Sequence, residues 1–221
     1  MSNDLALGIK VKERLEQLGI ETPMAVWNSP MQDEDRQALI SKHFHDIMEM
    51  LKLDLKDDSL QDTPARLAKM YVREIFYGLD YKNFPKCGIF KNKMKADEMV
   101  CVKNVLVRSV CEHHFVPFIG RAAVAYIPGD GIIGLSKINR IVEFFCRRPQ
   151  VQERLTEQVS AAMQLILGTT DVAVVIEAEH FCVKLRGVQD PHSDTVTSKL
   201  SGKFREVSDL RNEFLQLSKV R

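Results

Sequence analysis

The chain has 221 residues, of which 45% are hydrophobic and 28% are charged, and its 31 Lys and Arg nearly balance its 30 Asp and Glu. This composition is typical of a globular protein that is large enough to bury a core without disulfides. The formal net charge of +1 lacks the basic excess of proteins that bind nucleic acids or membrane surfaces, so an anion site must come from local clustering of cations.

The N-terminal segment MSNDLALGIKVKERL is polar and has no apolar region of the kind that defines a secretory signal. No apolar run approaches the ~18 residues that a membrane span requires. The five cysteines are an odd number and are widely spaced: Cys87, Cys101, Cys111, Cys146 and Cys182. We therefore expect a cytoplasmic protein whose cysteines are thiols or metal ligands, with no membrane or nucleic-acid partner.

The first part of the chain is predicted to be helical. A short first helix is followed by a polar, proline-bearing linker at residues 20–36. From Asp33 onward, apolar residues recur at helix spacing, which predicts a second helix. The segment DTPARLAKMYVREIF predicts a third helix, in which Thr63 fits an N-cap and Pro64 fits the first helical position.

The pattern changes after Gly88. Four segments rich in β-branched residues are predicted as strands: EMVCVKNVLVRSVC, GRAAVAYIP, DVAVVIEAEHFCVKL and DTVTSKLSGKF. Between the second and third strands, SKINRIVEFFCRR and VQERLTEQVSAAMQLILG are predicted as helices, the latter ending at Gly168, and a final helix starts near Ser208. The order predicts an α+β fold, with an antiparallel sheet and helices on one face, after a helical region at residues 1–90.

Two thiol–imidazole pairs are candidates for a metal site. In SVCEHHFVPFIG, Cys111 and His114 have a C-x-x-H spacing that lets both side chains converge where the backbone turns. In EAEHFCVK, His180 and Cys182 share a face if the segment is a strand. Cys111 and His114 alone are better explained by a buried cysteine beside satisfied histidines, whereas two such pairs together favour a metal site. Spacing does not decide which of five candidates are ligands: Cys111, His113, His114, His180 and Cys182.

Five cations are candidates for an anion site. They occur as two pairs spaced three apart on predicted helices and as one residue shortly after the second thiol: Arg66, Lys69, Lys137, Arg140 and Arg186. Each pair alone fits a solvated helix face. All five around one metal site would suit a polyphosphate, whose charge needs local compensation.

Three further polar residues stand at predicted helix starts. Ser136 fits an N-cap. Gln152 and Glu153 begin the second helix, where a carboxylate is favourable because of the helix dipole. A carboxylate can also accept two hydrogen bonds from adjacent N–H donors, and guanine offers such a pair at N1 and its exocyclic amine.

These segments together resemble the GTP cyclohydrolase I family. CEHHFVPFIGRAAVAYIP, GLSKINRIVEFFCRRPQVQERLT and HFCVKLRGVQ stand in the family's order, and DTPARLAKMY matches its upstream helical segment. The resemblance runs from about residue 35 to the C-terminus. Two departures, Phe115 where leucine is common and SKLSGKF in the last strand, touch no position that the family implies to be functional.

The resemblance implies a tunnelling fold, in which a four-stranded antiparallel sheet carries two helices. It assigns residues 91–221 to this catalytic domain. It also implies a homodecamer with active sites at subunit interfaces. The activity implied is the first step of tetrahydrofolate and pterin biosynthesis, in an allosteric enzyme of one-carbon metabolism: hydrolysis of the guanine imidazole ring of GTP at C8, with release of formate and formation of 7,8-dihydroneopterin triphosphate.

The same resemblance implies a role for each candidate residue. One Zn²⁺ per subunit would be held by Cys111, His114 and Cys182, with water in the fourth position. The acid–base groups would be His113 and His180, and Ser136 would join His180 at the ribose. Guanine would be bound by Gln152 and Glu153. The triphosphate would be held by the five cations: Arg66, Lys69, Lys137, Arg140 and Arg186.

Two other functions compete with this one. In a non-enzymatic zinc module, the metal only stabilises the fold, which calls for four protein ligands. In a thiol-nucleophile enzyme, Cys111 or Cys182 is activated by a histidine and needs no metal. Metal analysis and chelation separate the three functions.

Overall fold

The computed structural model describes residues 2–25 and 31–219. The chain divides into two compact units, one formed by Met1–Thr22 with Gly78–Arg221 and the other by Pro23–Tyr77. Part of the predicted linker at residues 20–36 lies outside the described residues, because residues 26–30 are not described. The assignment of residues 1–90 and 91–221 to separate domains stays a prediction.

The larger unit contains the predicted antiparallel sheet. Its four long strands are β2 (Val100–Cys111), β3 (Pro117–Tyr126), β6 (Val172–His180) and β7 (Thr195–Leu200), which pair antiparallel in that order. A two-residue strand, β5 (Pro149–Gln150), adds to the free edge of β2 in parallel. A separate two-stranded sheet joins β1 (Ile89–Lys91) to β4 (Gly131–Ile133). The prediction of an α+β fold with an antiparallel sheet is confirmed.

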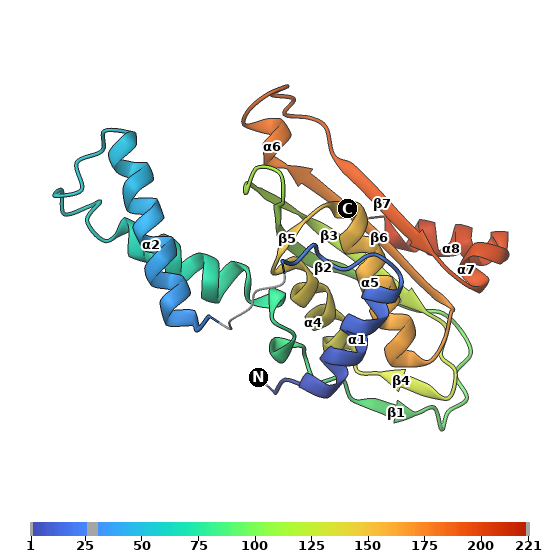
Figure 1. Ribbon diagram of the computed structural model, residues 1–221. Coiled ribbons are helices and arrows are strands. Elements are labelled where there is room, and N and C mark those ends of the chain that lie inside the picture. Colours follow the sequence, from blue (N-terminus) through green and yellow to red (C-terminus); the bar gives the residue numbers. More distant parts are fainter. Residues whose placement is uncertain (1, 26–30, 220–221) are drawn as a thin grey trace. The chain divides into compact units, whose positions relative to one another are not determined.

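Two helices cover one face of this sheet, as predicted. They are α4 (Leu135–Cys146) and α5 (Gln152–Leu167), with α1 (Leu5–Gln17) beside α5 (Figure 1). Because side chains alternate along a strand, Val172, Val174 and Ile176 all face the helices, where they are fully buried. The end of α5 at Gly168 is also confirmed, since this glycine has a φ of 65° and caps the helix in the left-handed conformation.

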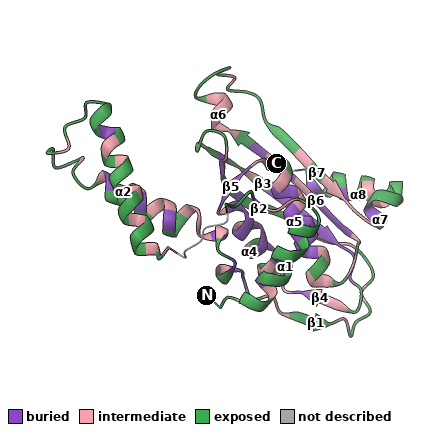
Figure 2. Cartoon of the chain, viewed as in Figure 1, coloured by how far each residue is buried: buried purple, intermediate pink, exposed green. Residues whose placement is uncertain are grey.

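The opposite face of the sheet is covered at one end by the C-terminal helices α7 (Lys203–Glu206) and α8 (Ser208–Ser218). The strands present small residues there, such as Ala123 and Ala173, and Phe204 and Phe214 pack against them. Figure 2 shows buried residues along the strands and on the helices α4 and α5. The start of the final helix at Ser208 agrees with the prediction.

Within the larger unit, a buried arginine ties the N-terminal segment to the rest of the unit. Arg148 is fully buried, and its guanidinium lies 2.9 Å from a Glu21 carboxylate oxygen. It also donates to the Gly78 carbonyl and lies over the rings of Phe144 and Phe145. This pairing compensates a charge that would be costly to bury alone.

The smaller unit is helical, with α2 (Asp33–Met50), α3 (Thr63–Lys69) and a π-helical turn, η1 (Met70–Ile75). The ring of Phe44 on α2 stacks on Tyr71 with centroids 5.5 Å apart. Helix α3 includes Thr63, and its N-cap position is Asp62, one residue earlier than predicted. Short 3-10 turns, η2 (Tyr77–Leu79) and η3 (Tyr81–Asn83), follow. Across the described residues, no helix combines the length and apolarity of a membrane span.

Candidate active site

The turn between β2 and β3 brings Cys111 and His114 together. Cys111 is the last residue of β2, and its carbonyl accepts a hydrogen bond from the Phe115 N–H at 2.9 Å. Phe115 has a φ of 54°, which is rare for a bulky residue and lets the chain reverse tightly. As a result, Nδ1 of His114 lies 3.9 Å from Sγ of Cys111.

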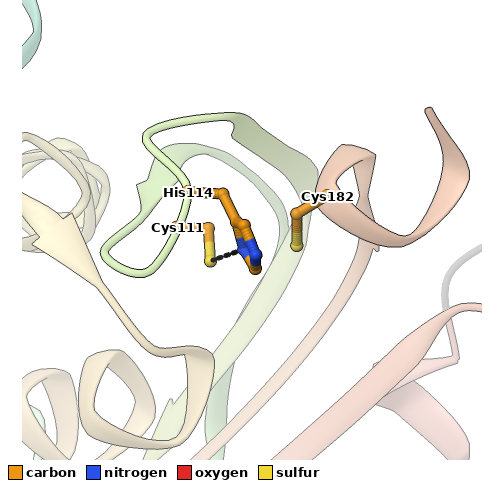
Figure 3. Close-up of side chains that lie close together, drawn as sticks. All are labelled: Cys111, His114 and Cys182. Carbon is orange, nitrogen blue, oxygen red and sulfur yellow. Dashed lines mark hydrogen bonds between the residues drawn. The ribbon is translucent and has the colours of Figure 1, made fainter. Parts of the chain in front are cut away.

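The third member of the cluster, Cys182, comes from α6 (Phe181–Lys184), directly after β6. The expectation that His180 and Cys182 share one face of a strand is wrong, because β6 ends at His180 and the chain turns into this short helix. The helix carries Cys182 toward the β2–β3 turn, as Figure 3 shows. The ligand atoms of Cys111, His114 and Cys182 all lie within 4.8 Å of one another.

The chemistry of this Cys–His–Cys cluster fits a zinc ion. Two sulfurs and one imidazole are ligands that zinc prefers, and structural and catalytic zinc sites are close to tetrahedral. With bond lengths of about 2.0–2.3 Å, ligand atoms of such a site lie roughly 3.5 Å apart, so a small contraction would complete it. Burial, and then the neighbouring Cys111 sulfur, raise the pKa of the Cys182 thiol, and a cation reverses that preference by favouring thiolates.

The adjacent His113 is placed differently from His114. Its Nδ1 also lies 3.9 Å from Cys111 Sγ, but its side chain is 64% exposed and its Nε2 is 3.9 Å from Glu112. It does not belong to the group whose ligand atoms converge with Cys182. The two neighbouring histidines therefore have separate surroundings.

Glu112, between Cys111 and His113, fastens the turn to α5. Both carboxylate oxygens accept hydrogen bonds from the Arg154 guanidinium, at 2.5 and 3.2 Å. The hydrogen bond from Arg154 holds the pKa of Glu112 below its usual value. The Glu112 N–H also donates to the Gln150 carbonyl at 3.0 Å. Sequence reasoning missed this ion pair, because nothing in the spacing of the two residues signals it.

His180 is held on the sheet rather than in the metal cluster. Its ring stacks on Phe118 with centroids 4.7 Å apart and planes 9° from parallel. Its Nε2 lies 2.8 Å from Oε1 of Gln152. Burial lowers the pKa of His180, so its neutral form is favoured near neutrality.

The start of α5 separates its two predicted guanine-binding residues. Gln152 is 1% exposed, whereas the next residue, Glu153, is exposed in the first turn of the helix. On α4, Ser136 is exposed and lies inside the helix, whose N-cap is Gly134. The expectation of an N-cap at Ser136 is therefore wrong by two residues.

The predicted cations lie in both units. Nη1 of Arg186 is 2.9 Å from Nε2 of His114, which puts Arg186 at the cluster. Lys137 and Arg140 lie in the first two turns of α4 and are half-buried. Arg66 and Lys69 are exposed on α3 in the smaller unit, where Arg66 pairs with Asp62 at 3.2 Å.

A second group of possible ligands, His45, Asp46 and Glu49, occurs on α2. These residues follow helix spacing on an accessible surface, and Asp46 is paired with Lys42 at 2.9 Å. They are typical of a charged helix face.

The fold and the site together define an α+β protein with a two-cysteine, one-histidine cluster that could hold a metal ion. The family described as GTP cyclohydrolase I matches residues 40–219. The GTP cyclohydrolase 1 proteins of Citrobacter koseri, Escherichia coli O1:K1 / APEC and Shigella boydii serotype 18 are each 55% identical to this chain over 216 residues, which cover 98% of this chain and 96% of theirs. The chain belongs to the GTP cyclohydrolase I family, which confirms the resemblance seen in its sequence.

Among solved structures, the apo form of the archaeosine synthase QueF-Like aligns with a TM-score of 0.42 and 17% identity. The alignment covers 49% of this chain and 97% of that one. This likeness is too distant to bear on the fold or the activity.

Proposed function

We propose that the chain is a zinc-dependent GTP cyclohydrolase I. It would hydrolyse the guanine imidazole ring of GTP at C8, release formate and form 7,8-dihydroneopterin triphosphate. The observation that carries this proposal is the convergence of the Cys111, His114 and Cys182 ligand atoms within 4.8 Å, in a chain whose relatives are GTP cyclohydrolase 1 proteins. One Zn²⁺ per subunit would be held by these three residues.

The cluster offers three protein ligands, as catalytic zinc sites commonly do, and so leaves a position for water. A zinc ion there supplies Lewis acidity, which makes water nucleophilic at neutral pH. The neutral His180 is suited to accept a proton and return it to a departing ring nitrogen, because histidine titrates close to neutrality. His113, exposed on the turn, is a second acid–base group, and Ser136 would join His180 at the ribose.

Guanine recognition is assigned to Glu153 and Gln152 at the start of α5. The exposed Glu153 carboxylate can accept from guanine N1–H and the exocyclic amine together, which adenine cannot match. The triphosphate would be held by the cations predicted for it: Arg66, Lys69, Lys137, Arg140 and Arg186. Arg186 supports this, because it lies beside His114 and so brings positive charge to the cluster.

The antiparallel sheet and its two covering helices support a tunnelling fold, with residues 91–221 as the catalytic domain after a helical region at 1–90. β7 is an edge strand whose outer backbone groups can pair with another chain. This edge supports assembly into a homo-oligomer, which we propose is a decamer with active sites at subunit interfaces. The enzyme would act in the cytoplasm, under allosteric control, at the first step of tetrahydrofolate and pterin synthesis.

Purified protein incubated with GTP tests the activity. We expect stoichiometric formate and a product that becomes fluorescent after oxidation, both lost after chelation and restored by added zinc. A protein that retains zinc but releases no formate would instead be a zinc module. Formate release that survives complete metal removal would favour a thiol nucleophile.

A further inference from the structure

The side-chain amide of Gln152 is fully engaged by protein groups. The two hydrogens of its Nε2 are shared among three acceptors: the Ile176 carbonyl at 3.0 Å, the Thr195 carbonyl at 2.9 Å and Thr197 Oγ1 at 3.1 Å. The residue is 1% exposed, so water does not compete for these bonds. The first turn of α5 is thereby fixed to both β6 and β7.

These partners determine which way the amide points. Carbonyl oxygens only accept hydrogen bonds, so the atom facing Ile176 and Thr195 must be the NH₂ group. The other end of the amide, Oε1, is an acceptor, and it lies 2.8 Å from Nε2 of His180. His180 Nε2 must therefore carry a proton, because two acceptors would repel each other at that distance.

The ring of His180 is held on a second side by Phe118, which stacks on it with centroids 4.7 Å apart. Rotation of the ring would break both the stacking and the hydrogen bond to Gln152. Within residues 2–25 and 31–219, no hydrogen bond is made to Nδ1 of His180. In a neutral imidazole with a proton on Nε2, Nδ1 has the free lone pair.

We propose that Gln152 is a positioning residue that fixes His180 as the Nε2–H tautomer, so that Nδ1 is the atom that exchanges protons in the reaction. The catalytic part of this inference rests on the proposed function. Nδ1 would take a proton from the attacking water and pass that same proton to the departing ring nitrogen. Gln152 Oε1 would accept from Nε2–H throughout and would stabilise the imidazolium formed between the two transfers.

This role belongs to the side chain of Gln152. The amide is buried, and its NH₂ group is already hydrogen-bonded to three oxygen acceptors. The guanine contact predicted for Gln152 would therefore be made by its backbone. Without the hydrogen bond to Gln152, the His180 ring would be less well placed for proton transfer. A displacement of about 1 Å can lower a reaction rate ~10²-fold.

Solid-state ¹⁵N NMR of zinc-loaded protein labelled with [¹⁵N]histidine tests the tautomer directly. The His180 signals are identified by their loss in His180→Asn. The informative variants are Gln152→Met, which keeps the shape but removes the acceptor, and Gln152→Glu, which in its protonated form keeps both an acceptor and a donor. The matched control is Gln158→Met, because Gln158 is an equally buried glutamine of α5 that bonds to Gln150 and to the Ile20 carbonyl, and not to His180.

We expect wild-type protein and Gln158→Met to contain His180 with a protonated Nε2 and an unprotonated Nδ1. Gln152→Met should show a mixture of tautomers, and its kcat for GTP should fall about 10- to 100-fold with little change in KM. Gln152→Glu should restore the tautomer and most of kcat.

A wild-type signal with the proton on Nδ1 overturns the inference, as does Gln152→Met with wild-type tautomer or wild-type kcat. The wild-type spectrum decides the assignment even if Gln152→Met does not fold. Protein that has the expected tautomer but does not turn over GTP would refute the proposed function and leave the tautomer assignment standing. Turnover with the other tautomer would refute only this inference.

Discussion

Two histidine-bearing corners of the site are held in opposite ways. At the β2–β3 turn, His113 and His114 are exposed and approach Cys111 Sγ only to 3.9 Å. On β6, His180 stacks on Phe118 and bonds to Gln152 at 2.8 Å. At the β2–β3 turn, the ligand atoms converge but make only long contacts with one another, as expected for a site that a cation would complete. The second corner is complete by itself, which suits a group that must keep one orientation while protons move.

The largest effect is expected at the cluster of Cys111, His114 and Cys182. Cys182→Ser removes one of two sulfur ligands, and we expect zinc content near zero and no detectable turnover. Elemental analysis of purified protein and a formate assay measure both. Cys101→Ser is the matched control, because Cys101 is a half-buried thiol of β2 outside the cluster, and it should keep zinc. Full zinc occupancy with normal activity in Cys182→Ser would refute the ligand assignment.

The two neighbouring histidines of the β2–β3 turn are expected to respond differently to substitution. His113→Ala should keep zinc and lose about 10²- to 10⁴-fold in kcat, because general acid–base catalysis typically contributes that much. His114→Ala should lose the metal itself. Zinc content and kcat are measured on both variants. The reverse pattern, with zinc lost only from His113→Ala, would mean that the two roles are exchanged.

The family resemblance grouped Cys111, His114 and Cys182, and the structure brings their ligand atoms within 4.8 Å of one another, whereas the local pattern around Cys182 led to a wrong expectation. EAEHFCVKL is rich in residues that favour strands, so its pattern predicts Cys182 beside His180 on one strand face. The chain instead enters α6 after His180, and that turn separates a cluster residue from a sheet residue. Secondary-structure propensity carries no signal for it, because tertiary packing decides where the strand ends.

The long-range side-chain pairs that hold the site residues in place are not predictable from the sequence. Gln152 and His180 are 28 positions apart, and Glu112 and Arg154 are 42 positions apart. Such pairs form because the first turn of α5 packs against β6 and β7 and places Arg154 beside the β2–β3 turn, and neither residue type nor spacing indicates them. The strands, helices and cap at Gly168 were predictable, since alternation, helical periodicity and turn residues are local signals.

A smaller effect is expected from removing the ion pair that holds the β2–β3 turn against α5. Arg154→Met keeps the ligands but removes the ion pair that fastens Glu112, so the β2–β3 turn should sample more conformations. Zinc affinity, measured by competition with a chromophoric chelator, should fall about 10- to 100-fold, as is typical when a partner behind a metal ligand is lost. Lys199→Met, which breaks a more exposed ion pair between β7 and Glu157, is the control. Equal zinc affinity in Arg154→Met and wild type would show that the pair only stabilises the fold.

An effect of similar size is expected at the start of α5, where Glu153 is assigned to guanine binding and Gln152 bonds to His180. Glu153→Ala should raise KM for GTP about 10- to 100-fold, by analogy with the 1–3 kcal/mol of a good bidentate contact to a base, and should leave zinc content unchanged. Glu157→Ala, one turn further along α5, is the matched control and should behave as wild type. An unchanged KM in Glu153→Ala would remove its role in guanine recognition.

A crystal structure of the purified protein, with anomalous diffraction measured on both sides of the zinc absorption edge, is the most direct test of the proposed zinc site. We expect a zinc peak bonded to Sγ of Cys111, Sγ of Cys182 and one imidazole nitrogen of His114, with no fourth side chain. A peak at another place, a fourth protein ligand, or His180 among the ligands would refute the proposed three-ligand zinc site.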